Sequence, residues 1–401
     1  MGEHRKTAVE SRRRKVTVDR IYLDNAATSW PKPESVYQAV DHAQRILGAP
    51  AGRGGYEQAV QAMRLIDQTR SDVARLINAP QHQDISFTFN GTDSLSTVLF
   101  GLLAPGDHVV TSVVEHNSVL RPLKHLESKG VTVTYVGCDE TGTFDENEVI
   151  DAIQANTRLV SLIHVSNVTG AIQPLANIKS GIRQSANPDA LFLIDAAQSL
   201  GHIPVDVQHL GCDFLAAPGH KALLGPLGTG ILFVAGDAAD IVTPFRYGGT
   251  GSSYENQPTK TPDKFESGNL NVPGIAGLKA GIDFLTSAEG KVAHETMTHN
   301  SELLLSQLLK IDGVKAQGHH TLKNRVGVFS IAIAGFDCHE ATNILDSVAG
   351  VQTRAGLHCA PLLHRALGTE PTGGTLRLSV GGFNTAQQIE KTVTAISELV
   401  S

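Results

Sequence analysis

Short apolar runs recur along the first two thirds of the chain, and longer segments of mixed polarity separate them. The mixed segments have helical length; residues 56–77, for example, carry apolar side chains at helical spacing, with arginines and acids on the other face. Apolar runs that alternate with helices form βα units on a buried, mainly parallel sheet. We therefore expect an α/β fold whose large domain is built on a mainly parallel seven-stranded sheet. The predicted strands are residues 84–89, 108–114, 132–136, 159–165, 191–194, 214–216 and 230–234.

The pattern changes in the last third of the chain. Residues 276–309 have a helical pattern, and a strand, a helix and a second strand follow before a terminal helix. This order predicts a smaller α+β domain at the C-terminal end. The elements predicted after the first helix are residues 326–333, 340–348, 374–380 and 386–400.

A long segment rich in Gly, Ser, Asn, Thr and Pro, residues 247–273, lies between the two patterns. We expect a loop there, and a loop of this length in a compact domain is usually functional or bound to a neighbouring subunit. The predicted organisation is a tail, a large domain whose first residues are also suited to packing on the small domain, and the small domain. Their boundaries are 1–20, 21–265 and 266–401.

Charge and composition narrow the class of partner. With 33 basic and 40 acidic residues, the formal net charge of −7 favours neither nucleic acid nor an anionic membrane surface. Apolar residues make up 41% of the chain, but no run approaches the ~18 uninterrupted apolar residues of a membrane-spanning helix. We expect a soluble protein that binds neither membrane nor nucleic acid.

The first twenty residues are basic, lack an apolar stretch and contain several acids, which argues against a secretory signal and favours a flexible tail. The cysteines are scattered without CxxC spacing, so we expect neither a metal site nor a disulfide framework. A reducing cytoplasm fits this cysteine usage best. The cysteines are Cys138, Cys212, Cys338 and Cys359.

One lysine lies where the sequence is otherwise apolar. Lys221 follows a predicted strand and precedes a glycine-rich run, and burial disfavours the charged form of a lysine. Asp195 directly follows the preceding strand, at the edge of the sheet where open α/β folds bind ligands. Taken singly, Lys221 is typical of a surface lysine and Asp195 of a helix N-cap. As a pair in this order they fit pyridoxal phosphate, which needs a lysine for its Schiff base and an acid at its ring nitrogen.

A phosphate site is predicted where the strand at 84–89 leads into a helix. Gly91 lets the backbone approach a ligand, Thr92 offers a hydroxyl, and the helix start provides free N–H groups. The alternative is an ordinary helix start capped by Thr92 or Asp93. The segment is neither a GxGxxG fingerprint nor a P-loop.

Polar side chains follow two further strands. His116 comes after one of them and is suited to stacking on a flat ring and moving protons. Asn167 comes after the other, and Gln198 lies three residues beyond Asp195 on the same face of a helical turn, so both are suited to bonding a ring oxygen. A single strand-end His or Asn is more often a helix cap, but polar groups at four strand ends favour one shared site.

With these motifs, the sequence resembles the class V aminotransferase family of fold-type I pyridoxal phosphate enzymes, in particular its cysteine desulfurase and selenocysteine lyase branch. The resemblance runs from YLDNAAT at Tyr22 to RLSVGGFNT ending at Thr385. It implies that Lys221 in the GHK motif bonds covalently to the cofactor and that Asp195 pairs with the ring nitrogen. The other implied cofactor contacts are His116, Asn167 and Gln198 at the ring and Gly91, Thr92 and His220 at the phosphate.

One position departs from the pattern of the family. The residue before GHK is often a serine whose hydroxyl binds the phosphate, whereas this chain has Pro218. In similar enzymes the loop that matches GGTGS at 248–252 reaches the phosphate of the partner subunit, so Thr250 is the expected replacement. The resemblance therefore also implies a homodimer with shared active sites.

A cysteine in the stretch GVQTRAGLHCAPLLHR indicates the reaction. Cys359 alone would be typical of a small core residue, but it lies in a loop near Arg354 and His358, and a cationic neighbourhood lowers the pKa of a thiol. In desulfurases the matching cysteine attacks the substrate sulfur, and the arginine that matches Arg377 holds the substrate carboxylate. Arg354, with Asn167, is a further candidate for substrate binding; its alternative role is an ion pair that shapes the loop.

The resemblance implies a pyridoxal phosphate-dependent cysteine desulfurase that converts L-cysteine to L-alanine and forms a persulfide on Cys359. Lys221 and His116 would act as acid and base, and an acceptor protein or small thiol would take the sulfur. Two alternatives stay open: a lyase for L-selenocysteine or another C–S substrate at the same site and, more distantly, a catalytically silent scaffold with this fold. A transaminase would have no use for Cys359.

Overall fold

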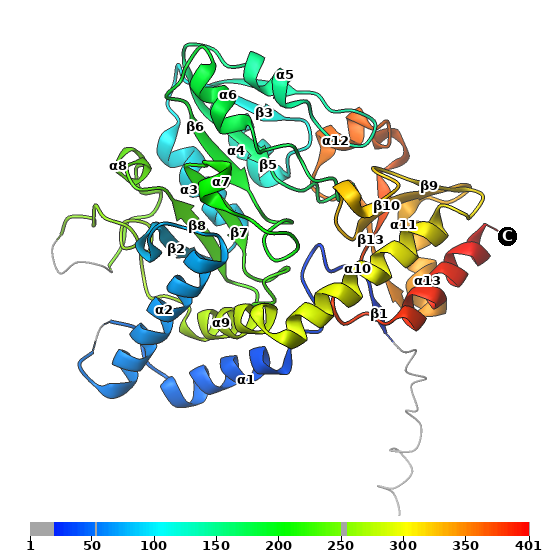
Figure 1. The fold of residues 1–401 in the computed structure, drawn as a ribbon, viewed down its shortest axis with the longest axis horizontal. Helices are drawn as coiled ribbons and strands as arrows, with labels where there is room; N and C mark the ends of the chain where they lie inside the picture. Colours follow the sequence, from blue (N-terminus) through cyan, green and yellow to red (C-terminus); the bar gives the residue numbers. More distant parts are fainter. Residues whose placement is uncertain (1–19, 53, 250–254, 401) are drawn as a thin grey trace, which may run out of the picture.

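The computed structural model describes residues 20–52, 54–249 and 255–400. Its main sheet is made of seven strands: Ile85–Thr88 (β2), His108–Ser112 (β3), Thr132–Val136 (β4), Thr157–Ile163 (β5), Leu191–Asp195 (β6), Phe214–Pro218 (β7) and Gly230–Val234 (β8). Their order is β2-β8-β7-β6-β5-β3-β4 (Figure 1). Strands β3 to β7 are parallel to one another, and β8 runs antiparallel to both β7 and β2.

The predicted mainly parallel sheet of seven strands is confirmed, with slightly different strand ends. β8 is antiparallel because the connection from β7, residues 219–229, contains no helix. A parallel return would need a longer crossover that spans the sheet. Strands β5, β6 and β7 end at Ile163, Asp195 and Pro218. The predicted site residues at and just after these strand ends therefore lie along one edge of the sheet.

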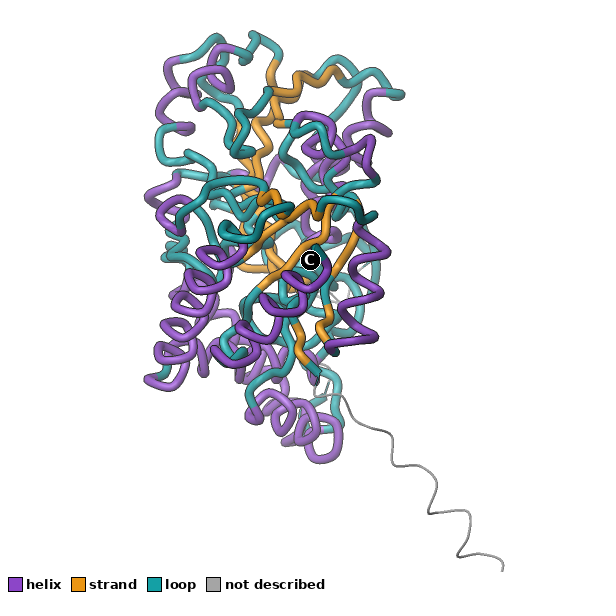
Figure 2. Tube along the Cα trace, turned by 90° about the vertical axis from the view of Figure 1, so that its right-hand side faces the viewer, coloured by secondary structure: helices purple, strands orange, loops and turns teal. Residues whose placement is uncertain are grey.

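Helices cover both faces of this sheet. On one face, α3 (Gly91–Leu102) and α4 (Asn117–Glu127) pack over a core that includes Phe214. On the other, α2 (Glu57–Leu76), α6 (Ile178–Gln184) and α9 (Val272–Thr286) pack over a core that includes Leu215. Neighbouring strand residues thus face opposite cores, as the period of two in a strand requires. Figure 2 shows the strands in the interior and the helices around them.

The C-terminal part forms the predicted smaller α+β unit. Its sheet has the order β12-β13-β10-β9, all antiparallel, from Arg354–Gly356 (β12), Thr375–Ser379 (β13), Val328–Ile333 (β10) and Val314–Ala316 (β9). Three helices complete its core: Ala288–Leu308 (α10), Cys338–Ile344 (α11) and Ala386–Leu399 (α13). α10 starts near the end of α9 and runs to this smaller sheet (Figure 1).

The helix predicted at 276–309 is two helices, which corrects the sequence-based expectation. Ser287 has an extended backbone and caps α10 by accepting the N–H of Gly290. A Cβ on Gly290 would lie 2.0 Å from the carbonyl oxygen of Phe284, so only glycine permits so close an approach of the two helices. The hydrophobic periodicity continues across Ser287, which is why the pattern alone did not reveal the break.

The N-terminal segment contacts both parts of the molecule. Ile21–Tyr22 (β1) pairs in parallel with Val351–Gln352 (β11), and the chain then continues to Glu34–His42 (α1), which packs on α9. Of the predicted tail, all but Arg20 lies outside the described residues. The domain boundaries at 20/21 and 265/266 stay predictions.

The remaining elements are short. No helix in the described ranges combines the length and the hydrophobicity that crossing a bilayer requires. The short helices are Glu146–Asp151 (α5), Val207–Leu210 (α7), Ala238–Ile241 (α8) and Pro361–Ala366 (α12); 3-10 turns lie at His82–Asp84, Leu322–Asn324 and Glu370–Thr372, and π turns at Ala43–Leu47 and Leu345–Ala349.

Candidate active site

A cavity of about 200 Å³ opens at the carboxyl ends of β5, β6 and β7, the position at which open α/β sheets bind ligands. The N-terminal segment, the starts of α3 and α4, and two strands of the smaller sheet complete its walls. Except for Cys359, every predicted site residue that the structure describes lines it. These residues are Gly91, Thr92, His116, Asn167, Asp195, Gln198, His220, Lys221, Arg354 and Arg377.

Asp195 and Lys221 face this one cavity. Asp195 is 3% exposed, and its Oδ1 accepts the N–H of Ala197 at 2.9 Å. Burial raises the pKa of the Asp195 carboxyl, against the opposite effects of the Ala197 N–H and of Lys221. Burial lowers the pKa of Lys221 to about 8, although Asp195 acts to raise it. Near neutral pH such a lysine is neutral, and hence nucleophilic, in a much larger fraction of molecules than an ordinary lysine.

Gln198 and Asn167 each use their amide nitrogen to hold another segment in place. Gln198 Nε2 donates to the carbonyl of Ala26 at 2.8 Å, and Asn167 Nδ2 donates to the carbonyl of His358 at 2.6 Å. The amide oxygens of both residues are buried without a partner among the described residues. Because buried polar atoms are rarely left unpaired, this wall of the cavity is suited to a bound ligand or to ordered water.

One end of the cavity is rich in donors. Asn90, rather than Thr92 or Asp93, caps α3, because its Oδ1 accepts the N–H of Asp93 at 2.9 Å. The Thr92 hydroxyl instead lies 2.8 Å from the Oγ of Ser118, which in turn lies 2.8 Å from His116 Nδ1. Two hydroxyls therefore meet beside the N-terminus of a helix, an arrangement suited to an anion.

Gly91 and Pro218 are in direct contact at this end. A Cβ on Gly91 would lie 3.2 Å from Pro218 Cδ, so glycine lets the start of α3 approach the end of β7 closely. Pro218 offers neither a hydroxyl nor an N–H, so the serine contact of the family is absent here. Ser118 was not predicted as a site residue, although it lines the same cavity. Its position two residues after His116, at a helix start, was the available signal.

His116 is both a helix cap and a cavity residue, so its two alternative roles coexist. Its Nδ1 accepts the N–H of Ser118 at 3.0 Å, which leaves the ring proton on Nε2. Burial, with the nearby charges of Lys221 and Arg354, lowers the pKa of His116 to about 3. The imidazole is therefore neutral near physiological pH.

His220 connects the lysine loop to the N-terminal segment. Its carbonyl accepts the N–H of Ser29 at 3.1 Å, the hydroxyl of Thr28 at 3.1 Å and the ammonium of Lys32 at 3.3 Å. Its ring lines the cavity, Nδ1 is buried without a partner among the described residues, and burial lowers the pKa of the imidazole to about 4. A neutral ring nitrogen is thus left for a ligand.

Two arginines come from the smaller sheet. Arg354 on β12 and Arg377 on β13 stand directly opposite each other in the antiparallel pair. Arg377 is 1% exposed; its Nη2 donates to Asp24 Oδ1 at 2.7 Å and its Nη1 to the carbonyl of Asn167 at 3.1 Å. Like charges opposite each other on a sheet repel, so this pair favours a bound anion.

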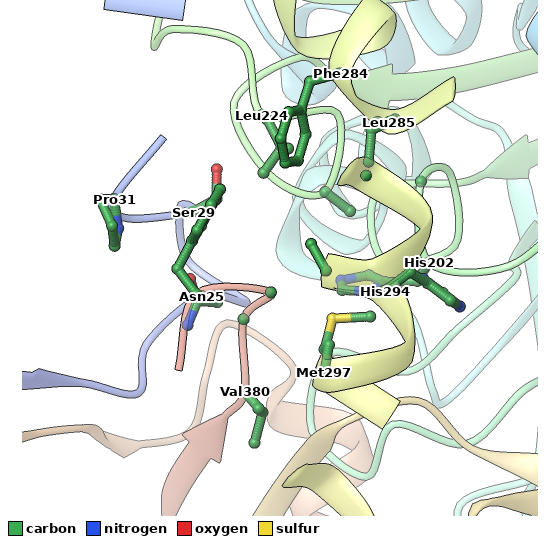
Figure 3. A pocket seen from close by; sticks show the side chains of 17 residues that line it. Asn25, Ser29, Pro31, His202, Leu224, Phe284, Leu285, His294, Met297 and Val380 are labelled. Carbon is green, nitrogen blue, oxygen red and sulfur yellow. The ribbon is translucent and has the colours of Figure 1, made fainter. Parts of the chain in front are cut away.

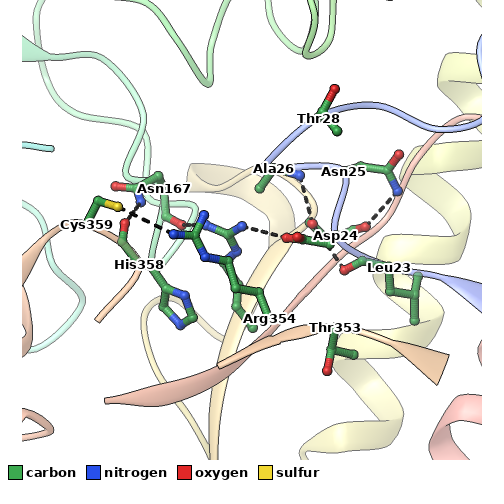
Figure 4. Close-up of polar contacts among 12 residues, drawn as sticks. Leu23, Asp24, Asn25, Ala26, Thr28, Asn167, Thr353, Arg354, His358 and Cys359 are labelled. Atoms are coloured by element: carbon green, nitrogen blue, oxygen red, sulfur yellow. Dashed lines mark hydrogen bonds and ion pairs between the residues drawn. The ribbon is translucent and has the colours of Figure 1, made fainter. Parts of the chain in front are cut away.

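Cys359 does not line the cavity but lies beside one of its walls. Its Sγ is 3.4 Å from Arg354 Nη2 (Figure 4). His358 and Cys359 have φ angles of +47° and +61°, in the left-handed region that residues other than glycine rarely adopt. Such backbone persists only where the surroundings fix it, and it concentrates at functional sites.

Three contacts fix the Cys359 loop. The N–H of Asn117 donates to the carbonyl of Cys359 at 2.6 Å, and Asn167 holds the carbonyl of His358. The ring of His358 donates from Nε2 to the carbonyl of Thr375 at 3.0 Å. The loop is therefore attached to the start of α4, to the segment after β5 and to β13.

A second cavity, of about 50 Å³, lies between the end of α9, the start of α10 and residues 380–383 (Figure 3). Phe284, Leu285 and Met297 give it an apolar wall, and no Lys, Arg, Asp or Glu lines it. It lacks the charged groups that a phosphate-bearing cofactor requires. Within the described ranges, no group of three or more His, Cys, Asp or Glu side chains is placed to hold a metal ion.

A family model described as aminotransferase class-V matches residues 21–392. The chain belongs to this family. A probable cysteine desulfurase of Methanothermobacter thermautotrophicus is 36% identical to it, over 93% of this chain and 92% of the relative. The apo structure of a cysteine desulfurase from Thermococcus onnurineus has 31% identity and a TM-score of 0.87, over 95% of this chain and 94% of that one. An Escherichia coli cysteine desulfurase structure has 28% identity and a TM-score of 0.83, covering 94% of each chain. The family and the fold expected from the motifs are confirmed.

Class-V aminotransferases are pyridoxal phosphate enzymes, and the residues of this cavity fit that group. A buried carboxyl at Asp195 suits the ring nitrogen, and a lysine of lowered pKa at Lys221 suits the aldehyde. The amide nitrogens of Gln198 and Asn167 each retain a second N–H for the ring oxygen. The donor-rich end with Ser118 suits the phosphate. Thr250, the predicted phosphate contact from a partner subunit, lies outside the described residues.

Proposed function

We propose that this protein is a pyridoxal phosphate-dependent cysteine desulfurase that converts L-cysteine to L-alanine and leaves a persulfide on Cys359. The observation that carries the proposal is a cysteine thiol 3.4 Å from an arginine that lines the cavity shared by Lys221 and Asp195. A transaminase site needs the lysine and the acid but not the thiol. The names of the relatives and of the solved structures agree with this assignment.

When bound, the cofactor withdraws electrons from the Cα of an attached amino acid, so that bonds at that carbon and at Cβ become labile. Asp195 would hold the ring nitrogen, and its burial keeps this contact out of water. Lys221 would anchor the aldehyde before substrate arrives. Asn167 and Gln198 would orient the ring oxygen, while Gly91, Thr92 and His220 would hold the phosphate.

Ser118 is our candidate for the contact that Pro218 cannot make. Its Oγ touches Thr92 Oγ1 and lines the same end of the cavity, so a phosphate there would meet two hydroxyls. Thr250 of a partner subunit is the second candidate, and it requires the predicted homodimer with shared sites. Phe245 and Tyr247, which precede that loop in the sequence, are exposed, and so is Phe89, whose ring contacts Arg246; exposed aromatic side chains of this kind are typical of an interface.

The substrate carboxylate would bind between Arg354 and Arg377. Arg377 already donates to Asp24 and to a backbone carbonyl, and its Nε is buried without a partner among the described residues. Among the described residues, the Arg354 side chain donates to Cys359 alone, and so has donors left. A carboxylate between the two guanidiniums could accept from both, and the rest of the substrate would then lie toward Lys221.

The sulfur step balances without any external oxidant. The Cys359 thiolate forms a bond to the substrate sulfur, the substrate Cβ–S bond breaks, and its electron pair stays with the carbon. Protonation of that carbon gives alanine, and Cys359 keeps the sulfur as a persulfide. Lys221 would take the proton from Cα, and the neutral ring of His116, which lines the same cavity, would move a proton at the substrate.

The persulfide requires an acceptor thiol, from a protein or a small molecule, to regenerate the enzyme. A cytoplasmic location, which keeps such thiols reduced, stays part of the proposal. L-Selenocysteine is a second candidate substrate, because selenium and sulfur analogues share shape and charge at the arginine pair. A catalytically silent scaffold is disfavoured by the presence of both Lys221 and Cys359.

The test is alanine and persulfide quantification with L-cysteine, using wild type, Cys359→Ala and Lys221→Ala. Wild type should release alanine and gain the mass of one sulfur atom on the peptide that contains Cys359. Cys359→Ala should keep the cofactor absorption band and lose alanine release from L-cysteine; retained selenide release from L-selenocysteine would favour the lyase alternative. Lys221→Ala should lose both. Full alanine release by Cys359→Ala would contradict the proposed function.

A further inference from the structure

The paired arginines create a charge problem that the substrate alone does not solve. Arg354 and Arg377 are cross-strand partners, and both line the cavity. Burial lowers the pKa of Arg377, Asp24 acts to raise it, and Arg354 lowers it further. Two guanidiniums with one monocarboxylate would leave the pocket with an unbalanced positive charge.

Asp24 supplies the missing negative charge. Its Oδ1 accepts from Arg377 Nη2 at 2.7 Å, Arg377 is 1% exposed at its side chain, and Asp24 is 21% exposed. Asp24 is not among the residues that line the cavity. It therefore neutralises Arg377 from outside, and the two arginines and Asp24 together carry one net positive charge; Cys359, beside Arg354, adds a negative charge only as the thiolate.

The backbone around Asp24 is fixed by the smaller sheet rather than by a ligand. The Leu23 N–H donates to the carbonyl of Gln352, and the Ser379 N–H donates to the carbonyl of Leu23. Asn25 Nδ2 donates to the carbonyl of Ser379 at 3.0 Å, and the backbone of Asp24 forms an isolated parallel β-bridge with Ser379. Figure 4 shows Leu23, Asp24 and Asn25 on the side of Arg354 opposite Cys359.

We propose that Asp24 is a positioning residue that sets the site to accept one carboxylate: by neutralising Arg377, it leaves a single positive charge for the substrate. Dicarboxylate amino acids then bring one more negative charge than the site balances, and they are disfavoured. This inference rests on the proposed function, since it assumes that an α-amino acid binds between Lys221 and the arginines.

A contact with a merely structural role would have a different signature. If Asp24 only oriented Arg377, its loss would weaken all carboxylate ligands to the same degree. If Asp24 sets the charge, its loss adds one uncompensated positive charge at the two arginines. The affinity for a ligand with two carboxylates then rises relative to the affinity for a ligand with one.

The test compares L-alanine with L-aspartate as ligands of the full-length, cofactor-loaded protein. Each amino acid is titrated while the change in the cofactor absorption band is recorded, so the readout is binding and not turnover. We expect Asp24→Asn to shift the ratio of the two dissociation constants about tenfold in favour of L-aspartate. Asp24→Glu, which keeps the charge, should retain the wild-type ratio.

The matched control is Asp213→Asn. Asp213 pairs with Lys179 at 2.6 Å with similar side-chain exposure, 18%, and it does not line the cavity. This variant should leave the ratio unchanged. Circular dichroism checks that each variant is folded, and Asp24→Ser makes the same test if Asp24→Asn is not folded.

An unchanged ratio in folded Asp24→Asn, or an equal loss of affinity for both ligands, would overturn the proposal. Failure of the proposed function is distinguishable from this result, because it appears as absent alanine release from L-cysteine in wild type. The binding ratio can be measured whether or not Cys359 accepts sulfur.

Discussion

Asn167 Nδ2 donates to the carbonyl of His358 at 2.6 Å, so a side chain that lines the cavity also holds the loop that carries Cys359. The same residue accepts from Arg377 through its carbonyl. Asn167 is thus the point at which the cofactor pocket, an arginine of the carboxylate site and the cysteine loop meet. Because the loop has a strained backbone at His358 and Cys359, loss of this bond should release it.

We predict that Asn167→Ala increases the rate at which iodoacetamide alkylates Cys359, by about tenfold, because a buried carbonyl loses its donor and the loop moves. Alkylation is followed by mass spectrometry of the peptide that contains Cys359. Gln198→Ala is the control, since Gln198 holds Ala26 rather than the loop. Equal alkylation rates in both variants and wild type would show that the bond does not position Cys359.

The hydroxyl of Ser118 yields a prediction about cofactor affinity. Ser118→Ala removes one of two hydroxyls that meet at the donor-rich end, so we expect the dissociation constant of pyridoxal phosphate to rise about tenfold. Equilibrium dialysis of the apo-protein with the cofactor measures it. Adding Pro218→Ser should restore part of the loss, because it returns the hydroxyl typical of the family. Unchanged affinity in Ser118→Ala would remove this residue from the phosphate site.

Much of the site could be predicted because strand ends in a parallel sheet converge on one edge. Asp195 ends one buried strand, His116 and Asn167 follow two others, and all three line one cavity. The sequence pattern thus located the cavity once the strands were recognised. Lys221 follows the same rule, since its loop leaves the end of β7.

The missed features depend on contacts that are distant in the sequence or on an exact side-chain geometry. Asp24 meets Arg377 across 353 positions, and no local pattern reports such a pair. Asn167 was expected to contact the cofactor ring and the substrate, whereas one of its N–H groups is used by the cysteine loop. The break at Ser287 does not interrupt the hydrophobic periodicity, so two helices were predicted as one.

The lowered pKa of Lys221 predicts how cofactor loading depends on pH. The pKa of Lys221 is about 8, so at lower pH the amine is mostly protonated and cannot attack an aldehyde. The rate at which apo-protein recombines with pyridoxal phosphate should therefore rise as the pH passes through about 8. Stopped-flow absorbance measures this rate. Because Asp195 raises the pKa of Lys221, Asp195→Asn should move the midpoint to lower pH.

A second lysine near the site provides the control for this profile. Burial also lowers the pKa of Lys32 to about 8, and its ammonium donates to the carbonyl of His220. Lys32→Met should keep the midpoint if Lys221 alone is the nucleophile. A midpoint that disappears in Lys32→Met would reassign the titration to Lys32.

Glu115 predicts a pH dependence of stability that is separate from the reaction. It is fully buried, its Oε1 accepts the N–H of Ile163 at 2.9 Å and the Ser112 hydroxyl at 2.7 Å, and its Oε2 is buried without a partner among the described residues. Burial raises the pKa of this carboxyl to about 8, and the neighbouring Asp195 acts in the same direction. Between pH 4.5, the ordinary pKa of a glutamate, and about pH 8, the folded protein therefore holds a proton that the unfolded chain has lost.

The folded state binds more protons than the unfolded chain over that pH interval. The contribution of Glu115 to stability is therefore largest below the interval and is lost as the pH rises through it. Glu115→Gln keeps an acceptor for Ile163 and removes the titration. We expect the free energy of unfolding of Glu115→Gln, relative to wild type, to increase as the pH is raised from about 5 to about 8, so that the variant gains stability relative to wild type. Urea unfolding of the apo-proteins at several pH values measures this difference, with Glu148→Gln, an exposed helix carboxylate, as the control. A difference that does not change with pH would mean that Glu115 is ionised in the folded protein.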